Sequence, residues 1–434
     1  MIQEIVARVQ ELFSVSRIED ARALLEAELA RGAGSAPIFT LLGYAHLYLA
    51  DPKTAQKVLE EAVAKFPDDA SAQEGLARVR WINGAGAGFA DQMIAAVAQY
   101  PGSDQLRLKC ADLLRLAGQY DNAERVIREG LSAQQDNASL RTWLGILLDE
   151  TGRLSEAELE FQAALKSFPG HPTLHLNLAH TLLRQGKADA ALEEIAAARR
   201  SEPGNQLAIT YTAMALKQKG DDRFNWLCDY QNHVQVFDVA PPPGFQSMSK
   251  FNSELAGRLR TLHAKAEHPL EQSLRGGSQT NQNLIFTKDP VVKLYLTNLR
   301  DSIGKYIVSL PNDPRHPLTA RKTGAFSIAG CWSVLLRPDG FHVNHTHPLG
   351  WISSAYYVSL PDQMSSPGGQ EGWIKFGEPR WPVPGVGIER VIEPKEGRLV
   401  LFPSYMWHGT IPFSKGERLT APFDVVPSQG GVRN

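Results

Sequence analysis

The first half of this 434-residue chain repeats itself every 34 residues. Glycine recurs at this interval at Gly84, Gly118, Gly152, Gly186 and Gly220. A second series of small residues recurs at Gly43, Ala77, Ala111, Gly145, Ala179 and Ala213. A period of this length is typical of a pair of antiparallel helices, in which small residues allow close helix contact and a glycine ends the first helix. Because such pairs bury their apolar faces only by stacking, the first half is predicted to be an α-solenoid.

The unit with the fullest pattern is residues 138–171, ASLRTWLGILLDETGRLSEAELEFQAALKSFPGH. Its Trp143, Gly145, Ala157 and Pro169 stand where the tetratricopeptide repeat has these residues, and the unit resembles that family. About six such units fit before residue 220. The resemblance implies a superhelix whose concave face binds a protein or peptide. An array that only braces the second half is the alternative.

The pattern of the sequence changes after Gly220, where the repeat register stops. A proline-rich stretch, DVAPPPGFQS (238–247), is predicted to be an extended connector. Helical spacing of apolar residues returns over 251–266 and 290–310. Beyond residue 320, short alternating runs separated by Gly, Pro and Asp turns are typical of strands.

These patterns together predict an α+β multidomain protein. We expect helices packed against a β-sandwich or barrel in the second half. The predicted domains are a repeat solenoid at 1–220, a linker at 221–250 and a β-rich domain at 251–434.

Three of the 12 histidines lie within the six residues HVNHTH, at 342–347. If this segment is a strand, His345 and His347 point to one side and His342 to the other. His408 lies in a later strand-like segment, LVLFPSYMWHGT. Two imidazoles from one strand and a third from another can hold a metal on one face and leave the opposite positions open. Imidazole suits iron, copper, nickel and zinc, so the residues alone do not select the metal.

An arginine follows this candidate metal site closely in the sequence. The segment ERLTAPFDV places Arg418 and Thr420 on one side of a predicted strand. A guanidinium beside a hydroxyl suits a carboxylate. A keto acid with a second carboxylate would satisfy both this pair and a metal with open positions. One of Tyr356 and Tyr357 must also face inward, where its phenol can hydrogen-bond such a co-substrate.

This arrangement resembles the Fe(II)- and 2-oxoglutarate-dependent oxygenases with the double-stranded β-helix (jelly-roll) fold, over about residues 240–430. It is most similar to a bacterial and phage group that is often joined to tetratricopeptide repeats. The wider superfamily has Asp or Glu where this chain has His347. The resemblance implies Fe(II) held by His345, His347 and His408, and 2-oxoglutarate held by Arg418 and Thr420. From the strand pattern we expect Tyr357 to be the inward-facing phenol that joins them.

The predicted function is therefore an oxygenase that hydroxylates a protein or peptide recruited by the repeats. Two alternatives stay open at this point. One is a three-histidine dioxygenase that does not use 2-oxoglutarate, and the other is a non-catalytic repeat scaffold with a degenerate barrel. The presence of Arg418 argues against both.

The composition argues against other classes of partner. A net charge of −2 gives no reason to expect nucleic acid or an anionic membrane. There is no run of 18 apolar residues, and the N-terminus does not resemble a signal peptide. Cys110, Cys228 and Cys331 are far apart and lack CxxC spacing, which is typical of reduced thiols. We therefore expect a cytoplasmic protein.

Overall fold

The computed structural model describes residues 2–428 except 33, 264–269, 271, 281 and 362–367. The chain divides into two compact units, which are Met1–Pro169 with Ala264–Gln272, and Gly170–His263 with Ser273–Asn434. No helix in the described part is both long and apolar enough to cross a lipid bilayer.

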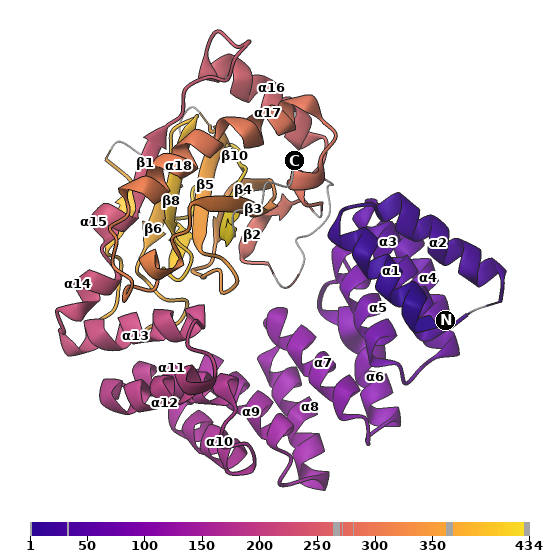
Figure 1. Ribbon diagram of the computed structural model, residues 1–434. Helices are drawn as coiled ribbons and strands as arrows, with labels where there is room; N and C mark the ends of the chain where they lie inside the picture. The colour runs from indigo at the N-terminus through magenta and orange to yellow at the C-terminus, as the bar shows by residue number, and fades with distance from the viewer. Residues whose placement is uncertain are drawn as a thin grey trace. The chain divides into compact units, whose positions relative to one another are not determined.

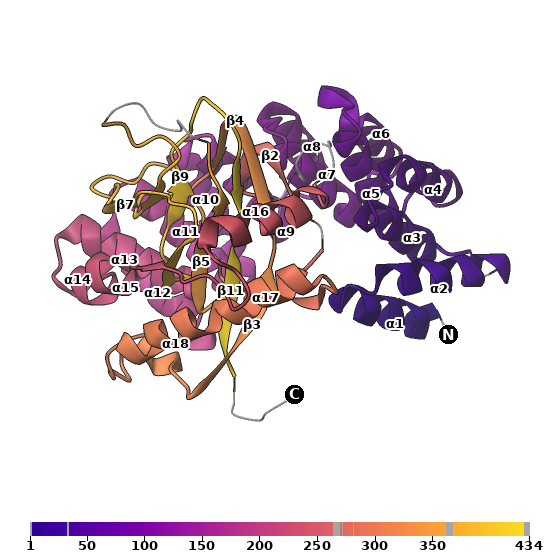
Figure 2. The same cartoon turned by 90° about the horizontal axis from the view of Figure 1, so that it is seen from above.

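The first unit is a series of antiparallel helix pairs, and Figure 2 shows successive helices lying side by side. The repeated glycines end the first helix of a pair because they adopt the left-handed conformation, with φ of +83° at Gly84, +76° at Gly118 and +84° at Gly152. The predicted solenoid is thus confirmed. Its helices are α1 (Ile2–Ser14), α2 (Ile18–Ala30), α3 (Ala36–Tyr48), α4 (Pro52–Lys65), α5 (Ala70–Ile82), α6 (Asp91–Gln99), α7 (Asp104–Leu116), α8 (Tyr120–Ala133), α9 (Ala138–Glu150) and α10 (Leu154–Ser167).

The small residues of the repeat sit where paired helices touch. A Cβ added to Gly145 of α9 would lie 2.7 Å from the Phe161 ring of α10, which is too close for a carbon atom to fit. A Cβ at Gly43 would meet the Leu59 side chain at 2.5 Å in the same way. The glycine at this position therefore sets how closely the two helices of a repeat approach.

The second unit begins with three helices that continue the repeat, α11 (Pro172–Arg184), α12 (Ala188–Ser201) and α13 (Gln206–Lys219). Gly220 ends α13 with a φ of +65°. Ile209, Ala213 and Leu216 of α13 belong to the same hydrophobic core as the strands that follow. The predicted boundary at residue 220 therefore marks the end of the repeat fold but falls inside a compact unit that starts at Gly170.

The predicted linker at 221–250 contains regular structure of the second unit. It includes α14 (Arg223–Leu227), α15 (Tyr230–His233), β1 (Gln235–Asp238) and the start of α16 (Met248–Arg260). β1 pairs with β8 (Arg398–Pro403), so this part of the chain is an edge of the sheet. The longest stretch without helix or strand in this segment is the proline-rich one between β1 and α16, because its prolines cannot donate to a ladder.

The strands form two antiparallel sheets. The larger has the order β1-β8-β5-β10-β4-β2, with β11 pairing both β3 and β5, and the smaller has the order β7-β6-β9. This arrangement confirms the predicted jelly-roll type of domain. The remaining strands are β2 (Leu274–Gln279), β3 (Ala325–Cys331), β4 (Val334–His342), β5 (Ile352–Ser359), β6 (Ile374–Phe376), β7 (Arg390–Ile392), β9 (His408–Thr410), β10 (Arg418–Thr420) and β11 (Phe423–Ser428).

Two helices, α17 (Pro290–Asn298) and α18 (Arg300–Ser309), run across the larger sheet (Figure 1). The Tyr295 hydroxyl of α17 donates a hydrogen bond to the carbonyl of Ala421, next to β11. The predicted helix at 290–310 is thus two consecutive helices. The predicted helix at 251–266 ends at Arg260, and its last three residues lie outside the described residues.

Candidate metal centre

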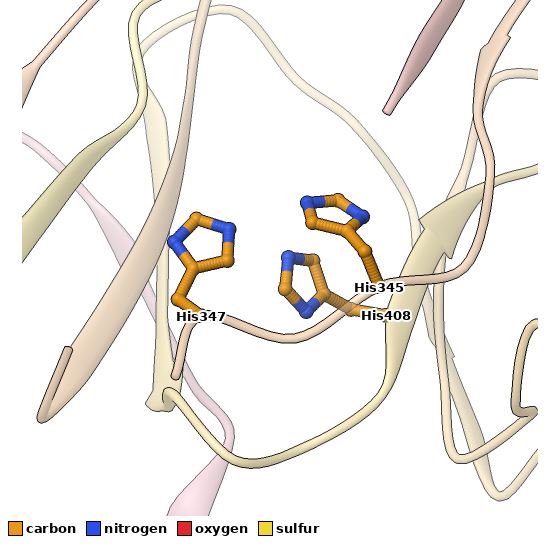
Figure 3. A group of neighbouring side chains, drawn as sticks. All are labelled: His345, His347 and His408. Atoms are coloured by element: carbon orange, nitrogen blue, oxygen red, sulfur yellow. The ribbon is translucent and has the colours of Figure 1, made fainter. Parts of the chain in front are cut away.

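Three imidazoles meet where the two sheets adjoin. One ligand atom from each of His345, His347 and His408 lies within 4.8 Å of the others, and Figure 3 shows the three rings around a common space. His408 opens β9 and forms an isolated antiparallel bridge with His345, with N···O distances of 2.9 and 3.1 Å. The backbone N–H of His347 donates to the carbonyl of Ser404 at 2.9 Å. Backbone hydrogen bonds therefore fix all three residues before any ligand binds.

The environment of His342 differs from the sequence-based expectation. β4 ends at His342, so the alternation of a strand does not continue through 343–347. The ring of His342 stacks against that of His345 at 5.8 Å instead of facing away from it. The Ser273 hydroxyl lies 3.0 Å from His342 Nδ1 and 3.4 Å from His345 Nε2. The prediction that His342 lies on the opposite side is wrong because the strand ladder stops there.

The second ring nitrogen of each clustered histidine already has a partner. Nδ1 of His345 lies 2.9 Å from the carbonyl of Val343, and Nδ1 of His408 lies 3.0 Å from that of Met406. A carbonyl only accepts, so both Nδ1 atoms carry the proton and the lone pair of each ring is on Nε2. This is the tautomer that binds metals. The donor set therefore fits a divalent transition metal.

Burial keeps His345 and His408 in the neutral form that metal binding needs. It lowers the pKa of His345 to about 3, and the neighbouring His347 adds to this effect. Burial likewise lowers the pKa of His408 and of His342 well below the ordinary value, with His345 contributing in both cases. Neither His345 nor His408 has to lose a proton at neutral pH before it coordinates a metal.

A buried arginine lies beside the cluster. Arg418 of β10 donates from a terminal guanidinium nitrogen to the Thr410 hydroxyl at 3.2 Å, and Thr410 lies two residues after His408 on β9. Because residues i and i+2 of a strand share a face, the guanidinium is on the histidine side of β9. The guanidinium carbon of Arg418 also lies over the Tyr357 ring, 5.0 Å from the ring centroid. Thr420 is buried two residues after Arg418 in the same strand.

Two buried polar atoms near the cluster lack partners. Among the described residues, neither Arg418 Nε nor the Tyr357 hydroxyl makes a hydrogen bond. Burial raises the pKa of Tyr357, and the charge of Arg418 opposes the rise. Unpaired buried groups are costly, so a guanidinium and a phenol left open together suit an anionic ligand that accepts from both. The arrangement fits a carboxylate at the position the sequence predicts.

Sequence reasoning missed an aspartate at the centre. Both oxygens of Asp424, on β11, lie 2.8 Å from His347 Nδ1. The two residues are 77 positions apart, and no motif links them. Two further stretches of the sequence also contribute to the candidate centre. SLRGGSQT supplies Ser273 and β2, and GWIKFGEPR supplies Phe376, which pairs with His408 in the smaller sheet.

Asn344 joins the cluster to the turn after β6. Its side-chain amide donates to Glu378 at 2.9 Å and to the carbonyl of Pro379 at 3.2 Å. A Cβ at Gly409 would lie 2.2 Å from the Asn344 side-chain oxygen, so this contact requires a glycine between His408 and Thr410. Asn344 thus supports the segment that carries His345.

The strand and loop that lead into His408 also rest on α13. The Thr210 hydroxyl donates to the carbonyl of Tyr405 at 2.7 Å, and the Trp407 indole N–H donates to the sulfur of Met214 at 3.2 Å. All four residues are buried. A helix of the repeat fold thus holds the residue immediately before a candidate metal ligand.

Models of known families match segments in both halves of the chain. A family model described as "Putative 2OG-Fe(II) oxygenase" matches residues 330–424, which include the three histidines, Arg418 and Asp424. Models of the tetratricopeptide repeat match residues 40–104, 108–172 and 150–212. No curated protein matches the chain.

Several solved structures resemble parts of the chain. A tetratricopeptide repeat protein from Parabacteroides merdae is 14% identical, covers 51% of this chain and 88% of its own, and gives a TM-score of 0.39. A prolyl-4-hydroxylase from Pseudomonas putida is 15% identical, covers 47% and 98%, and gives 0.31. A tetratricopeptide repeat protein from Thermus thermophilus is 21% identical, covers 50% and 100%, and gives 0.30. The family models, not these structures, support the assignment that follows.

Proposed function

Because the chain joins tetratricopeptide repeats to a 2OG-Fe(II) oxygenase domain, we propose that it is an Fe(II)- and 2-oxoglutarate-dependent oxygenase that hydroxylates a protein or peptide. One observation carries the proposal. Three convergent histidines and a buried arginine with an unpaired Nε lie on the same side of β9. A metal site alone does not need the arginine, and an anion site alone does not need the histidines.

In this proposal His345, His347 and His408 hold Fe(II) through their Nε2 atoms. When bound, Fe(II) and 2-oxoglutarate activate O2, so that a C–H bond of the substrate is hydroxylated while the keto acid is converted to succinate and CO2. The protein holds the rings of His345 and His408 in one tautomer and keeps them neutral. The cofactors supply the oxidation, and the chain supplies their orientation.

Arg418 is proposed to hold the distal carboxylate of 2-oxoglutarate, with Thr420 and Tyr357 as the hydroxyl partners. Arg418 Nε and the Tyr357 hydroxyl are the atoms without partners, so a carboxylate there would pair both. Thr410 keeps the guanidinium from turning away because it accepts from another of its nitrogens. The buried position excludes water, which strengthens the charge-assisted hydrogen bonds.

The repeats are proposed to recruit the substrate. Stacked helix pairs present an extended concave surface on which polypeptides commonly bind, and both repeat models match within this region. Binding energy from residues remote from the reacting bond can orient that bond at the metal. The expected substrate is therefore a polypeptide with a recognition segment longer than the barrel itself can hold.

Anaerobic titration tests the co-substrate proposal. Addition of Fe(II) and then 2-oxoglutarate is expected to give a visible metal-to-ligand charge-transfer band. Arg418→Ala is expected to raise the 2-oxoglutarate concentration needed by about 100-fold, since a charge-assisted contact costs about 3 kcal/mol to remove. Arg337→Ala is the matched control and should behave as wild type. An unchanged requirement in Arg418→Ala, or metal binding without the band, would favour a dioxygenase that uses no keto acid.

The metal ligands are tested separately. Ala in place of His345, His347 or His408 is expected to abolish stoichiometric Fe(II) binding with the fold retained. His342→Ala should still bind one equivalent, because its nitrogens are outside the cluster of ligand atoms. Full binding by His347→Ala would contradict the assignment.

A further inference from the structure

The three histidines of the candidate centre differ in what lies behind them. His345 and His408 each donate from Nδ1 to a neutral backbone carbonyl two residues earlier in the chain. His347 instead faces a carboxylate, with both oxygens of Asp424 at 2.8 Å from its Nδ1. One imidazole of the three is therefore backed by a full negative charge.

Asp424 is held in place by contacts of its own. It lies on β11 opposite Ser353 of β5, and the Ser353 hydroxyl donates to Asp424 Oδ1 at 2.7 Å. Ser353 also lies 2.9 Å from the Ser404 hydroxyl, and the Ser404 carbonyl accepts from the backbone N–H of His347. The His347–Asp424 pair is thus tied to the sheet at both ends, so the carboxylate is aimed at the imidazole.

The charge of Asp424 bears on the net charge of the metal centre, which differs from that of the usual ligand set. Iron(II) oxygenases of the facial type use two histidines and one carboxylate, which leaves a divalent ion with one net positive charge. Three neutral imidazoles leave it with two. A carboxylate one imidazole away from the ion returns the difference, because it polarises the N–H of the ligand and makes the ligand more basic.

We propose that Asp424 is the charge-compensating residue of the metal centre, and that His347 and Asp424 together replace the single carboxylate ligand of a two-histidine site. Asp424 is a positioning residue, since it acts through His347 and does not reach the metal. The inference rests on the proposed function only in requiring a divalent metal at the three histidines. It needs neither 2-oxoglutarate nor the oxygenase reaction.

The first test uses Co(II) alone as the probe, in the full-length protein. Asp424→Asn keeps an oxygen that can accept from His347 but removes the charge. We expect its Co(II) affinity to fall by 10- to 100-fold, the usual range for an outer partner of a ligand, with a changed visible Co(II) spectrum. The reduction potential of bound iron should rise, because the ferric form loses a stabilising charge.

The matched control is Glu378→Gln. It removes another carboxylate near the centre, one that accepts from Asn344, pairs with Lys375 and makes no hydrogen bond to the three ligand imidazoles among the described residues. Its Co(II) affinity and spectrum should stay within about threefold of wild type, since a charge without direct contact is screened. Equal losses in Asp424→Asn and Glu378→Gln would overturn the proposal, because the effect would then come from the general field. No loss in Asp424→Asn would overturn it as well.

A charge-relocation variant provides the second test. In His347→Asp/Asp424→Asn the carboxylate moves from behind the ligand to the ligand position itself. We expect this double variant to recover most of the Co(II) affinity that Asp424→Asn loses. Failure of the double variant to bind Co(II) with the fold intact would overturn the proposal. Failure of succinate formation in wild type would count against the proposed function alone.

Discussion

Helices α9 and α13 occupy the same place in the repeat but face different neighbours. Thr142 of α9 and Thr210 of α13 are two periods apart in the sequence. The Thr142 hydroxyl donates to the carbonyl of Ala138 in its own helix at 2.7 Å. The Thr210 hydroxyl lies 3.0 Å from the corresponding carbonyl of its own helix, that of Gln206, but it also donates at 2.7 Å to the carbonyl of Tyr405, 195 residues away and next to the His408 segment. The same repeat position is thus a local contact in one unit and part of the metal centre's support in the other.

Helices α13 and α11 also contact a second segment near the candidate metal centre, the turn that follows β6. Gln218 of α13 donates to the carbonyl of Pro384 at 3.0 Å, and His180 of α11 packs edge-on against Trp381 at 5.5 Å. This turn starts at Gly377, whose N–H donates to the carbonyl of Trp407 at 2.9 Å. One continuous repeat pattern therefore serves two purposes. It builds the helix pairs of the first unit, and through α11–α13 it forms part of the barrel domain.

The largest expected effect comes from cutting the chain on either side of α11–α13. A chain that starts at Gly170 should fold and bind Co(II) as the full-length protein does. A chain that starts at Asp221 loses the partners of Tyr405 and Trp407, at about 1–3 kcal/mol for each buried polar group, and exposes the apolar core beneath α13. We expect it to be insoluble or to bind Co(II) more than 100-fold more weakly. Equal Co(II) affinity of the two truncated chains would show that α13 is dispensable.

The next effect concerns the small residue of the repeat. Gly145→Val should destabilise the first unit by about 3 kcal/mol, because its side chain would overlap the Phe161 ring. Thermal unfolding should show the loss, and Co(II) affinity should not change. Ala213→Val at the matching position of α13 should lower both stability and Co(II) affinity. If Gly145→Val also weakens Co(II) binding, the two units are coupled in a way the comparison does not include.

A smaller effect is expected from the matched threonines. Thr210→Val keeps the shape but leaves the buried carbonyl of Tyr405 without its donor, which should cost about 2 kcal/mol and weaken Co(II) binding by about tenfold. Thr142→Val removes only a hydrogen bond within its own helix and should change Co(II) affinity by less than twofold. Isothermal titration with Co(II) compares the two variants directly.

The smallest effect is a pH dependence confined to the first unit. Burial alone raises the pKa of Glu74, but hydrogen bonds from Lys109 and Arg78 outweigh it and lower the pKa below its usual value of 4.5. A lowered folded-state pKa contributes stability above the unfolded value, and this contribution is lost as the pH falls through the folded one. Glu74→Gln should cost about 1 kcal/mol at pH 7 and flatten the loss of stability below pH 4.5. Chemical unfolding of both proteins from pH 7 to 3 measures the difference.

The sequence predicts those features that depend on local spacing. The glycine series requires left-handed residues at the helix ends, and these occur at Gly118 and Gly152. The pair of His345 and His347 was predicted to act with His408, and the structure brings the three together although the HTH segment is not a strand. The spacing of two residues was informative because it holds in any extended backbone.

Features that depend on contacts distant in the sequence could not be predicted. Asp424 reaches His347 because β11 pairs with β5, and nothing in PFDVV indicates that pairing. The repeat pattern runs through Gly170 without interruption, so it does not show that α11–α13 belong to the second compact unit or that α13 packs with strands that come about 200 residues later. Periodicity reports which face of a helix is covered but not what covers it.

The separation of Thr210 and Tyr405 in the sequence also affects the order of folding during synthesis. A ribosome adds about 5–20 residues per second, so the 195 residues between them take about 10–40 s to synthesise. Helix α9, by contrast, meets α10 within about 1–3 s of its own synthesis, because its partner follows it directly in the chain. During translation all the repeat helices are therefore made before the strands. The apolar side of α13 stays uncovered until those strands have been synthesised.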